Sequence, residues 1–143
     1  MKAKYIIIIG CGILGSTLAN RLSSAGHSLV VIDQDEESFK NLGDEYSGFM
    51  IHGDANEFFI INQAKIDHAD IVLALTDDDN LNIMLSQICS KLYHVSRVIA
   101  RVNNPKSSNV FQKLGIETIC PALLASEELI RALVVTEIRG EEK

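Results

Sequence analysis

The sequence predicts an α/β fold in which a doubly wound, parallel six-stranded sheet carries helices on both faces. Short apolar segments alternate with segments whose apolar residues recur at helical spacing along almost the whole chain. Several of the apolar segments are nearly unbroken, which is typical of parallel strands buried on both faces. Six strands and their crossover helices use nearly all 143 residues, so we expect a single domain that spans residues 1–143.

The first strand and the turn that follows it hold the most specific pattern in the chain. Four isoleucines lead directly into the run Gly10-Cys11-Gly12-Ile13-Leu14-Gly15, which has the spacing G-x-G-x-x-G. Gly10 allows a tight turn, Gly12 leaves room for a pyrophosphate, and Gly15 lets the next helix pack closely. The free N–H groups at the start of that helix then face the phosphates. The run predicts a Rossmann-like nucleotide site, and a tight turn without a ligand is the alternative.

An acidic residue at the tip of the second strand indicates which nucleotide to expect. Gly26 ends the first helix, and Ser28 to Ile32 form the second strand. Asp33 follows, about twenty residues beyond the turn, where a carboxylate accepts hydrogen bonds from a ribose 2′-hydroxyl and repels a 2′-phosphate. Asp33 and the neighbouring Gln34 therefore favour NAD(H) or an adenine nucleotide (ATP, ADP or AMP) over NADP(H). The alternative for Asp33 is a solvated surface carboxylate.

The rest of the chain continues the alternation of helix and strand. The expected elements are a helix at 34–42, a strand at 48–51, a helix at 57–65, a strand at 71–75, a helix at 81–92, a strand at 96–102, a helix at 106–114, a strand at 116–120 and a last helix from Pro121. The last helix carries a wide apolar stripe, made of Leu123, Leu124, Leu129, Ile130, Leu133 and Val134. Residues 139–143 are expected to form a polar tail.

Ligands of an open parallel sheet bind beyond the carboxyl ends of its strands. The sequence places five further candidates there: Asp54 and Ala55, Thr76 and Asp77, and Arg101. Asp54 either meets an adenosine or caps a helix. Thr76 presents its N–H and hydroxyl to the ligand, caps the next helix, or does both. Arg101 is costly to bury unpaired, so we expect a phosphate partner or a salt bridge to Asp54 or Asp77.

The composition argues against two kinds of interaction, with nucleic acid and directly with a membrane. With 47% hydrophobic and 22% charged residues, the chain has the composition of a globular protein. Its formal net charge is −6, and it has no basic stripe that could bind nucleic acid. No apolar segment approaches the roughly twenty residues that cross a bilayer, so we expect no direct membrane insertion.

The cysteines and acidic residues predict no metal site. Three widely spaced cysteines without a metal pattern are typical of a reducing cytoplasm. Cys11 lies at a helix start, which can lower the pKa of a thiol, so redox sensing through Cys11 is a hypothesis. The acidic run Asp77 to Asp79 lacks the spacing of an EF-hand. The sequence also shows no Ser/His/Asp or Cys/His set that would indicate nucleophilic catalysis.

With these residues assembled, the chain resembles a regulator-of-potassium-conductance (RCK) domain. The resemblance is to the KTN or Trk-N type, found in regulatory subunits of Trk and Ktr potassium-uptake systems. It extends from Lys4 to about Leu133 and is carried by the glycine turn and three other segments. These are H-G-D-A at 52–55, T-D-x-D-x-x-N at 76–82 and A-R-V-N-N-P at 100–105.

The resemblance implies a cytoplasmic regulatory subunit, peripheral to the membrane through a transporter partner. Such domains bind NAD(H) or adenine nucleotides, transfer no hydride, form homo-oligomers from dimers to rings through the last helix, and gate a membrane potassium channel or transporter. By position, the glycine turn, Asp33, Asp54, Thr76, Asp77 and Arg101 match their nucleotide contacts.

Two departures from that family affect the expected ligand and domain content. Some members carry an arginine in the glycine turn where this chain has Ile13 or Leu14, which weakens the case for a triphosphate preference. Many members add a C-terminal ligand-binding subdomain, which we expect to be absent here.

Two other functions stay open at this point. One is a minimal or split NAD-dependent oxidoreductase cofactor domain, which needs a proton donor near the nicotinamide. The other is a redox-sensing interaction module that responds to NADH and to the state of Cys11.

Overall fold

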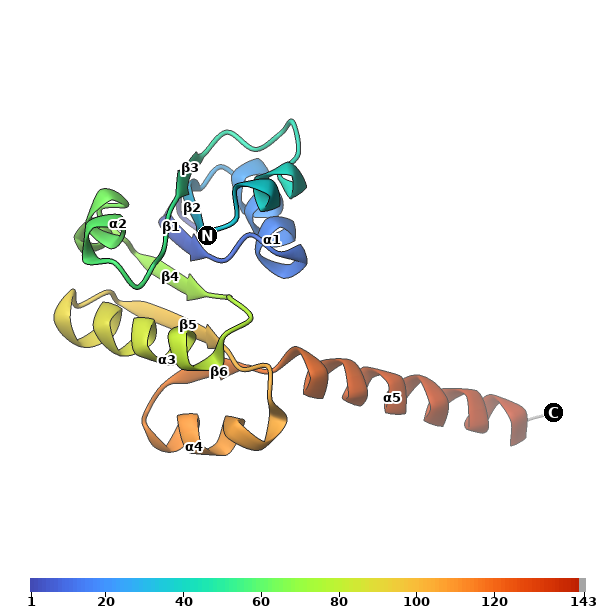
Figure 1. The fold of residues 1–143 in the computed structure, drawn as a ribbon. Coiled ribbons are helices and arrows are strands. Elements are labelled where there is room, and N and C mark those ends of the chain that lie inside the picture. Colours follow the sequence, from blue (N-terminus) through green and yellow to red (C-terminus); the bar gives the residue numbers. More distant parts are fainter. Residues whose placement is uncertain (142–143) are drawn as a thin grey trace.

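All six strands lie parallel in one sheet, in the order β3-β2-β1-β4-β5-β6 (Figure 1). This is a computed structural model, and it describes residues 1–141. The strands are β1 (Tyr5–Ile9), β2 (Ser28–Asp33), β3 (Phe49–His52), β4 (Ile71–Ala74), β5 (Arg97–Arg101) and β6 (Glu117–Ile119). The winding reverses between β1 and β4, so these neighbours form the switch point of the sheet. The predicted doubly wound, Rossmann-like α/β fold is confirmed.

The two central strands end at the same level. In the register of the pair, Ile9 of β1 lies beside Ala74 of β4. The Leu75 N–H then donates to the Ile9 carbonyl (2.8 Å), and the Gly10 N–H donates to the Ile32 carbonyl (2.8 Å). The turns that follow β1 and β4 therefore start side by side.

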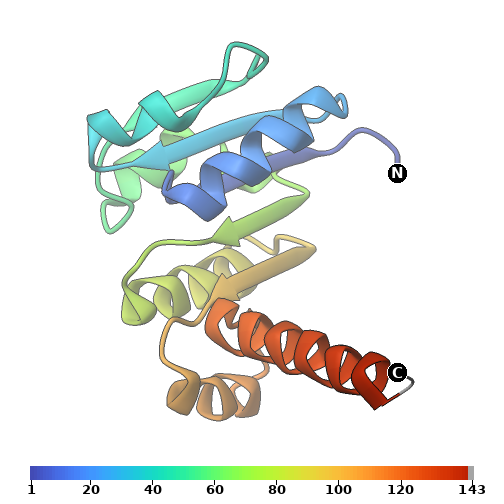
Figure 2. The ribbon, with the colours of Figure 1, turned by 90° about the vertical axis from the view of Figure 1, so that its right-hand side faces the viewer.

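Helices cover both faces of the sheet (Figure 2). The helices that pack along the sheet are α1 (Ile13–Ser24), α2 (Phe58–Gln63), α3 (Asp79–Gln87) and α4 (Ser108–Lys113), and a further helix, α5 (Pro121–Glu141), extends away from it. Ile6 and Ile8 pack in the cluster that includes α1, whereas Ile7 and Ile9 pack in the cluster that includes α2 and α3. All four are buried, and each such side chain stabilises the fold by about 1.5–3 kcal/mol.

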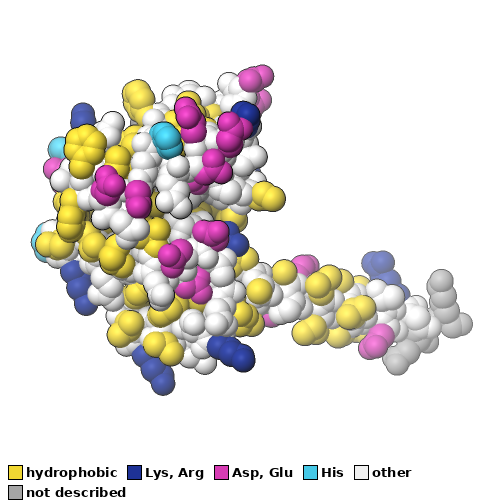
Figure 3. All heavy atoms as spheres, in the orientation of Figure 1, with side chains coloured by type: hydrophobic (Ala, Val, Ile, Leu, Met, Phe, Trp, Pro, Cys, Tyr) yellow, Lys and Arg dark blue, Asp and Glu magenta, His cyan; other side chains and the backbone are white. Residues whose placement is uncertain are grey.

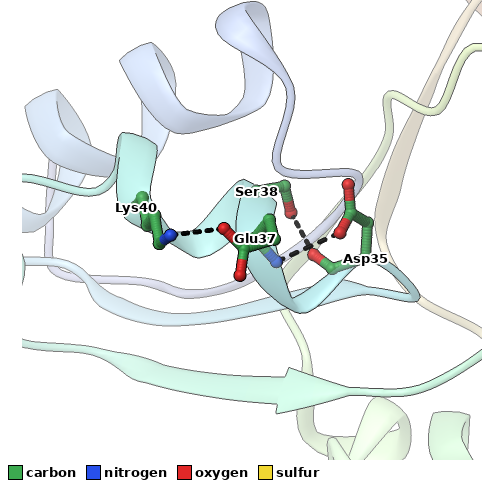
Figure 4. A network of polar contacts seen from close by, with 4 residues as sticks. All are labelled: Asp35, Glu37, Ser38 and Lys40. Atoms are coloured by element: carbon green, nitrogen blue, oxygen red, sulfur yellow. Dashed lines mark hydrogen bonds and ion pairs between the residues drawn. The ribbon is translucent and has the colours of Figure 1, made fainter.

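The helix expected at 34–42 is instead a 3-10 helix at Glu36–Asn41. Side chains bind the backbone groups that an α-helix would use (Figure 4). The Asp35 carboxylate accepts from the Glu37 N–H (3.1 Å), and the Ser38 hydroxyl donates to the Asp35 carbonyl (2.7 Å). Glu37 also pairs with Lys40. The segment has no fully buried residue, so packing does not favour a longer helix.

Other boundaries differ from the sequence predictions for local reasons. The helix expected at 57–65 ends at Gln63 because Lys65 has a φ of 56°, in the left-handed region. The helix expected at 81–92 passes from α3 into a π-helix at Ile88–Leu92.

The helix α5 begins at Pro121, as predicted, and extends away from the sheet (Figure 1). The polar tail predicted from residue 139 is helical as far as it is described, because α5 continues to Glu141. The last two residues of that predicted tail, 142–143, lie outside the described residues. Among the helices of residues 1–141, none has both the length and the apolar character needed to cross a bilayer.

Candidate functional site

A hollow of about 640 Å³ lies beyond the carboxyl ends of the central strands, at the switch point of the sheet. This is the position at which open α/β sheets hold their ligands. The structure brings together there the following predicted site residues: Gly10, Gly12, Asp33, Gln34, Asp54, Ala55, Thr76, Asp77 and Arg101.

The other four predicted residues do not line this hollow. Cys11 and Gly15 are buried. Ile13 is 84% exposed, and Ile13 and Leu14 instead line a second hollow of about 470 Å³ beside Arg101 and Pro121. The hydrophobic side chains of the glycine turn, Ile13 and Leu14, therefore lie near the start of α5.

The three glycines of the turn are needed for different reasons. Gly10 has a φ of +109°, and a Cβ there would lie 2.8 Å from the Leu75 carbonyl group. A Cβ on Gly15 would lie 1.9 Å from the Gly10 carbonyl oxygen. A Cβ on Gly12 would meet no atom within 4 Å among the described residues. Gly10 and Gly15 are therefore required by the fold, whereas Gly12 keeps open a space that the protein itself does not use.

The start of α1 opens on the same hollow. Its N-cap is Gly12, and no side chain of the described residues caps it. The first hydrogen bond of the helix runs from the Ser16 N–H to the Gly12 carbonyl (2.9 Å). The N–H groups before Ser16 and the positive end of the helix dipole therefore favour an anion beside Gly12.

Asp33 connects β2 to the glycine turn, a contact that the sequence prediction missed. One carboxylate oxygen accepts from the Cys11 N–H (2.7 Å) and the other accepts from the Asp35 N–H (2.8 Å). Each oxygen has a second lone pair, so the carboxylate can still accept a hydrogen bond from a ligand. These two bonds fix the direction in which Asp33 faces the hollow.

The Cys11 thiol is not activated, which contradicts the proposed redox role. Cys11 is 0% exposed, and burial together with the Asp33 charge raises the pKa of the thiol to about 11. Only the thiolate is reactive, so burial and the raised pKa disfavour a redox role for this thiol. The helix start does not offset the burial because the Cys11 side chain packs into the core beside α1.

Thr76 does not cap α3, and its N–H does not face the hollow. Asp78 is the cap, since its carboxylate accepts from the Leu81 N–H (3.2 Å). The Thr76 N–H donates to the side-chain oxygen of Asn82 (3.0 Å), and the Thr76 hydroxyl lies 2.6 Å from the same oxygen. Thr76 still lines the hollow, but Asn82 binds the polar groups that the sequence assigned to a ligand.

Asp54 is not a helix cap either. Its carboxylate accepts from the backbone N–H (2.9 Å) and the side-chain amide (3.0 Å) of Asn56. The N-cap of α2 is Glu57, so Asp54 belongs to the turn that lines the hollow.

Arg101 carries an unsatisfied donor. Its Nε is buried without a hydrogen-bond partner in the described part of the chain. The expected salt bridge to Asp54 or Asp77 is wrong, because the ion pairs found in residues 1–141 all join other residues. A buried unpaired donor is costly, so the site fits a negatively charged group beside Arg101.

The hollow is otherwise acidic. Figure 3 shows acidic side chains gathered on the face of the domain in view. Its carboxylates come from Asp33, Asp35, Asp54, Asp77 and Asp78, and Arg101 is the single base among its lining residues within 1–141. Asp35, Ser38, Asn56 and Asp78 were missed from the sequence. Asp35, Asn56 and Asp78 directly follow predicted site residues in the turns after β2, β3 and β4, which is the signal that could have found them. Ser38 lies in the 3-10 helix Glu36–Asn41 and has no such signal in the sequence.

The strand order and the hollow at the switch point define the class of this protein: it is a Rossmann-like α/β domain. The chain belongs to the TrkA-N domain family, whose model matches residues 6–121. The resemblance found in the sequence is thereby confirmed.

Known relatives agree with this assignment. The chain is 33% identical over 130 residues to the Trk system potassium uptake protein TrkA of Streptomyces coelicolor, covering 91% of this chain and 58% of that protein. It is 36% identical over 115 residues to a TrkA homolog of Methanothermobacter thermautotrophicus, covering 80% and 53%. The chain thus spans little more than half the length of these relatives.

A solved structure with the same fold contains a bound dinucleotide. The GsuK channel bound to NAD matches with a TM-score of 0.80 and 26% identity, over 96% of this chain and 24% of the channel chain.

Proposed function

We propose that this chain binds NAD(H) or an adenine nucleotide and acts as a cytoplasmic regulatory subunit of a potassium channel or transporter. The observation that carries the proposal is the pairing of an open space at Gly12 with an unpaired Arg101 Nε in one hollow. Both features fit a phosphorylated ligand. The relatives named as potassium uptake proteins supply the physiological context.

The lining residues suggest how the parts of a nucleotide are bound. Asp33 binds the ribose hydroxyls, since its oxygens retain free lone pairs. Gly12 and the start of α1 bind the phosphates from one side, and Arg101 from the other. A carboxylate at Asp33 repels a 2′-phosphate, so NAD(H) is preferred to NADP(H).

The charge of the hollow argues for a regulatory site rather than an enzyme. A hydride-transfer site needs a proton donor or acceptor with a pKa near neutrality. Among residues 1–141, the ionisable side chains that line the hollow are aspartates and one arginine. The bound NAD of the GsuK channel, a structural neighbour, belongs to a channel.

The exposed stripe on α5 supports assembly of several copies. Leu123, Leu124, Leu129, Ile130, Leu133 and Val134 are 41–66% exposed on a helix that extends from the domain (Figure 3). An exposed apolar surface of this extent favours association. We therefore propose a homo-oligomer, from a dimer to a ring, that pairs through α5 and binds a membrane potassium-transport subunit.

Regulation then follows from a shift between two shapes of the assembly. A nucleotide can bias a gate only by the difference in its affinity for the two shapes. The test is potassium flux into vesicles that carry a Trk-type membrane subunit from the same organism, with the purified chain and with NAD or ADP. We expect the flux to change with nucleotide in the presence of the chain. Flux that responds to neither nucleotide would contradict the regulatory role.

A further inference from the structure

Asn82 is a completely buried polar residue near the start of α3, with 0% exposure. Its side-chain oxygen accepts from the N–H (3.0 Å) and the hydroxyl (2.6 Å) of Thr76. Its side-chain amide donates to the carbonyls of Thr76 (2.9 Å) and Arg101 (2.9 Å). All four hydrogen-bonding positions of the side chain are used, so its orientation is fixed.

These bonds join the ends of two neighbouring strands. The backbone ladder between β4 and β5 ends at the pair Ala74 and Ala100. Beyond that pair, the two segments are no longer paired: β4 has ended and leads into the turn at Thr76, whereas β5 ends at Arg101. Asn82 spans this separation, and it replaces the next step of the ladder with a side chain.

A second side chain of the same helix turn continues the connection. The Asp79 carboxylate accepts from the Asn103 N–H (2.7 Å), the Asn103 amide (2.8 Å) and the Asn104 N–H (3.0 Å). The first turn of α3 therefore fixes Arg101 in two ways. Asn82 binds the Arg101 carbonyl, and Asp79 binds the loop that follows Arg101. Arg101 lines both the main hollow and the second hollow beside the start of α5.

We propose that Asn82 is a positioning residue of the nucleotide site: it sets the place of Arg101 relative to the Thr76 turn. The inference rests on the proposed nucleotide binding. Asn82 itself is 0% exposed and is not among the residues that line the hollow, so its side chain is out of reach of a ligand there. It acts through Arg101, whose unpaired Nε needs a fixed position to meet a phosphate. A purely structural Asn82 would support only the packing of α3 on the sheet.

Ser86 offers a matched control for that structural alternative. It lies one turn further along α3, is also buried, and donates its hydroxyl to the Asn82 carbonyl (2.7 Å). Ser86→Ala thus removes a buried hydrogen bond of the same helix but leaves the bonds to Thr76 and Arg101 in place.

The experiment measures dissociation constants of ADP and adenosine by calorimetry, together with melting temperatures without ligand. It uses the full chain and the variants Asn82→Ala, Ser86→Ala, Arg101→Ala and the double variant of Asn82 and Arg101. We expect Asn82→Ala to weaken ADP at least about tenfold, which corresponds to about 1.4 kcal/mol, and adenosine less than about twofold. Ser86→Ala should leave the ratio of the two affinities unchanged.

The double variant distinguishes an effect that passes through Arg101 from a general disturbance of the fold. Because Asn82 acts through Arg101, Asn82→Ala should cause no further selective loss of ADP once Arg101 is alanine. Equal loss of ADP and adenosine, or additive losses in the double variant, would overturn the inference. If Asn82→Ala does not fold, Asn82→Ser serves as the milder variant, and an unchanged ratio of the two affinities there would count equally against the inference. If the unaltered chain binds neither ADP nor NAD, the proposed function fails first and the inference falls with it.

Discussion

Replacing the second and third glycines of the turn separates binding from folding. A methyl group on Gly12 has no described atom within 4 Å, and the residue has a φ of −72° and a ψ of −163°. Alanine adopts that extended conformation without strain. A methyl group on Gly15 would lie 1.9 Å from the Gly10 carbonyl oxygen, in backbone that cannot easily move. Gly12→Ala should therefore impair ligand binding, and Gly15→Ala should impair folding.

The expected change in stability at Gly12 is small because two effects oppose each other. Alanine restricts the unfolded chain and stabilises the protein by about 0.4–1 kcal/mol. Alanine is also a poorer N-cap than glycine, by roughly 0.5–1 kcal/mol. The free energy of unfolding of Gly12→Ala should therefore stay close to that of the unaltered chain.

The expected change at Gly15 is large. Alanine gains about 1 kcal/mol in helix propensity over glycine. The overlap with the Gly10 carbonyl costs about 3 kcal/mol or more, the upper end for overpacking, since both groups are held by backbone. A net loss of about 2 kcal/mol lowers the melting temperature of a domain of this size by roughly 5–10 °C.

Denaturation and calorimetry with NAD distinguish the two variants. Gly12→Ala should melt like the unaltered chain and bind NAD at least about tenfold more weakly, a loss of about 1.4 kcal/mol. Gly15→Ala should melt at a lower temperature. Undiminished NAD binding by a folded Gly12→Ala would refute the reasoning, because the phosphates would then not approach this glycine.

Three further predictions concern the carboxylates and α5. Asp33→Ala should narrow the preference for NAD over NADP, which competition binding measures; an unchanged preference would remove Asp33 from the ribose contact. Burial raises the pKa of Asp79, but hydrogen bonds from Asn103 and Asn104 and the charge of Arg101 outweigh it, so the pKa is lowered overall. The stability that Asp79 contributes is therefore present above the unfolded pKa of about 3.9 and lost as the pH falls through the lower folded value, so Asp79→Asn should flatten the acid limb of a stability-against-pH curve. A limb as steep as that of the unaltered chain would contradict this assignment. Leu129 and Leu133 are 65% and 66% exposed on α5, so changing both to glutamate should convert an oligomer to a monomer in analytical ultracentrifugation without lowering the melting temperature of the monomer; an intact oligomer would place the interface elsewhere.

The sequence carries enough information for the sheet and for much of the site. Unbroken apolar runs such as Ile6 to Ile9 predict buried parallel strands, and the structure confirms all six strands. Parallel strands bring their carboxyl ends to one edge of the sheet, so Asp33, Thr76 and Arg101 meet although they are far apart in the chain.

The sequence does not reveal which polar groups are already bound within the protein. Spacing alone cannot show that Asn82 takes up the Thr76 N–H, because that bond depends on how α3 sits on the sheet. The sequence does not reveal either whether the side chain of a given residue is buried. Cys11 lies at a helix start, which lowers a thiol pKa when the side chain is exposed, but here the thiol packs inward and its pKa rises to about 11. The 3-10 helix at Glu36–Asn41 also depends on local side-chain bonds rather than on periodicity.

The most direct test of the central claim is a calorimetric titration of the purified chain with NAD, NADH, NADP, ATP, ADP and AMP. The hollow at the switch point, with its open Gly12 and unpaired Arg101, predicts saturable binding of NAD(H) or an adenine nucleotide and little binding of NADP. Absence of binding by all six nucleotides would contradict the claim that this hollow is a nucleotide site.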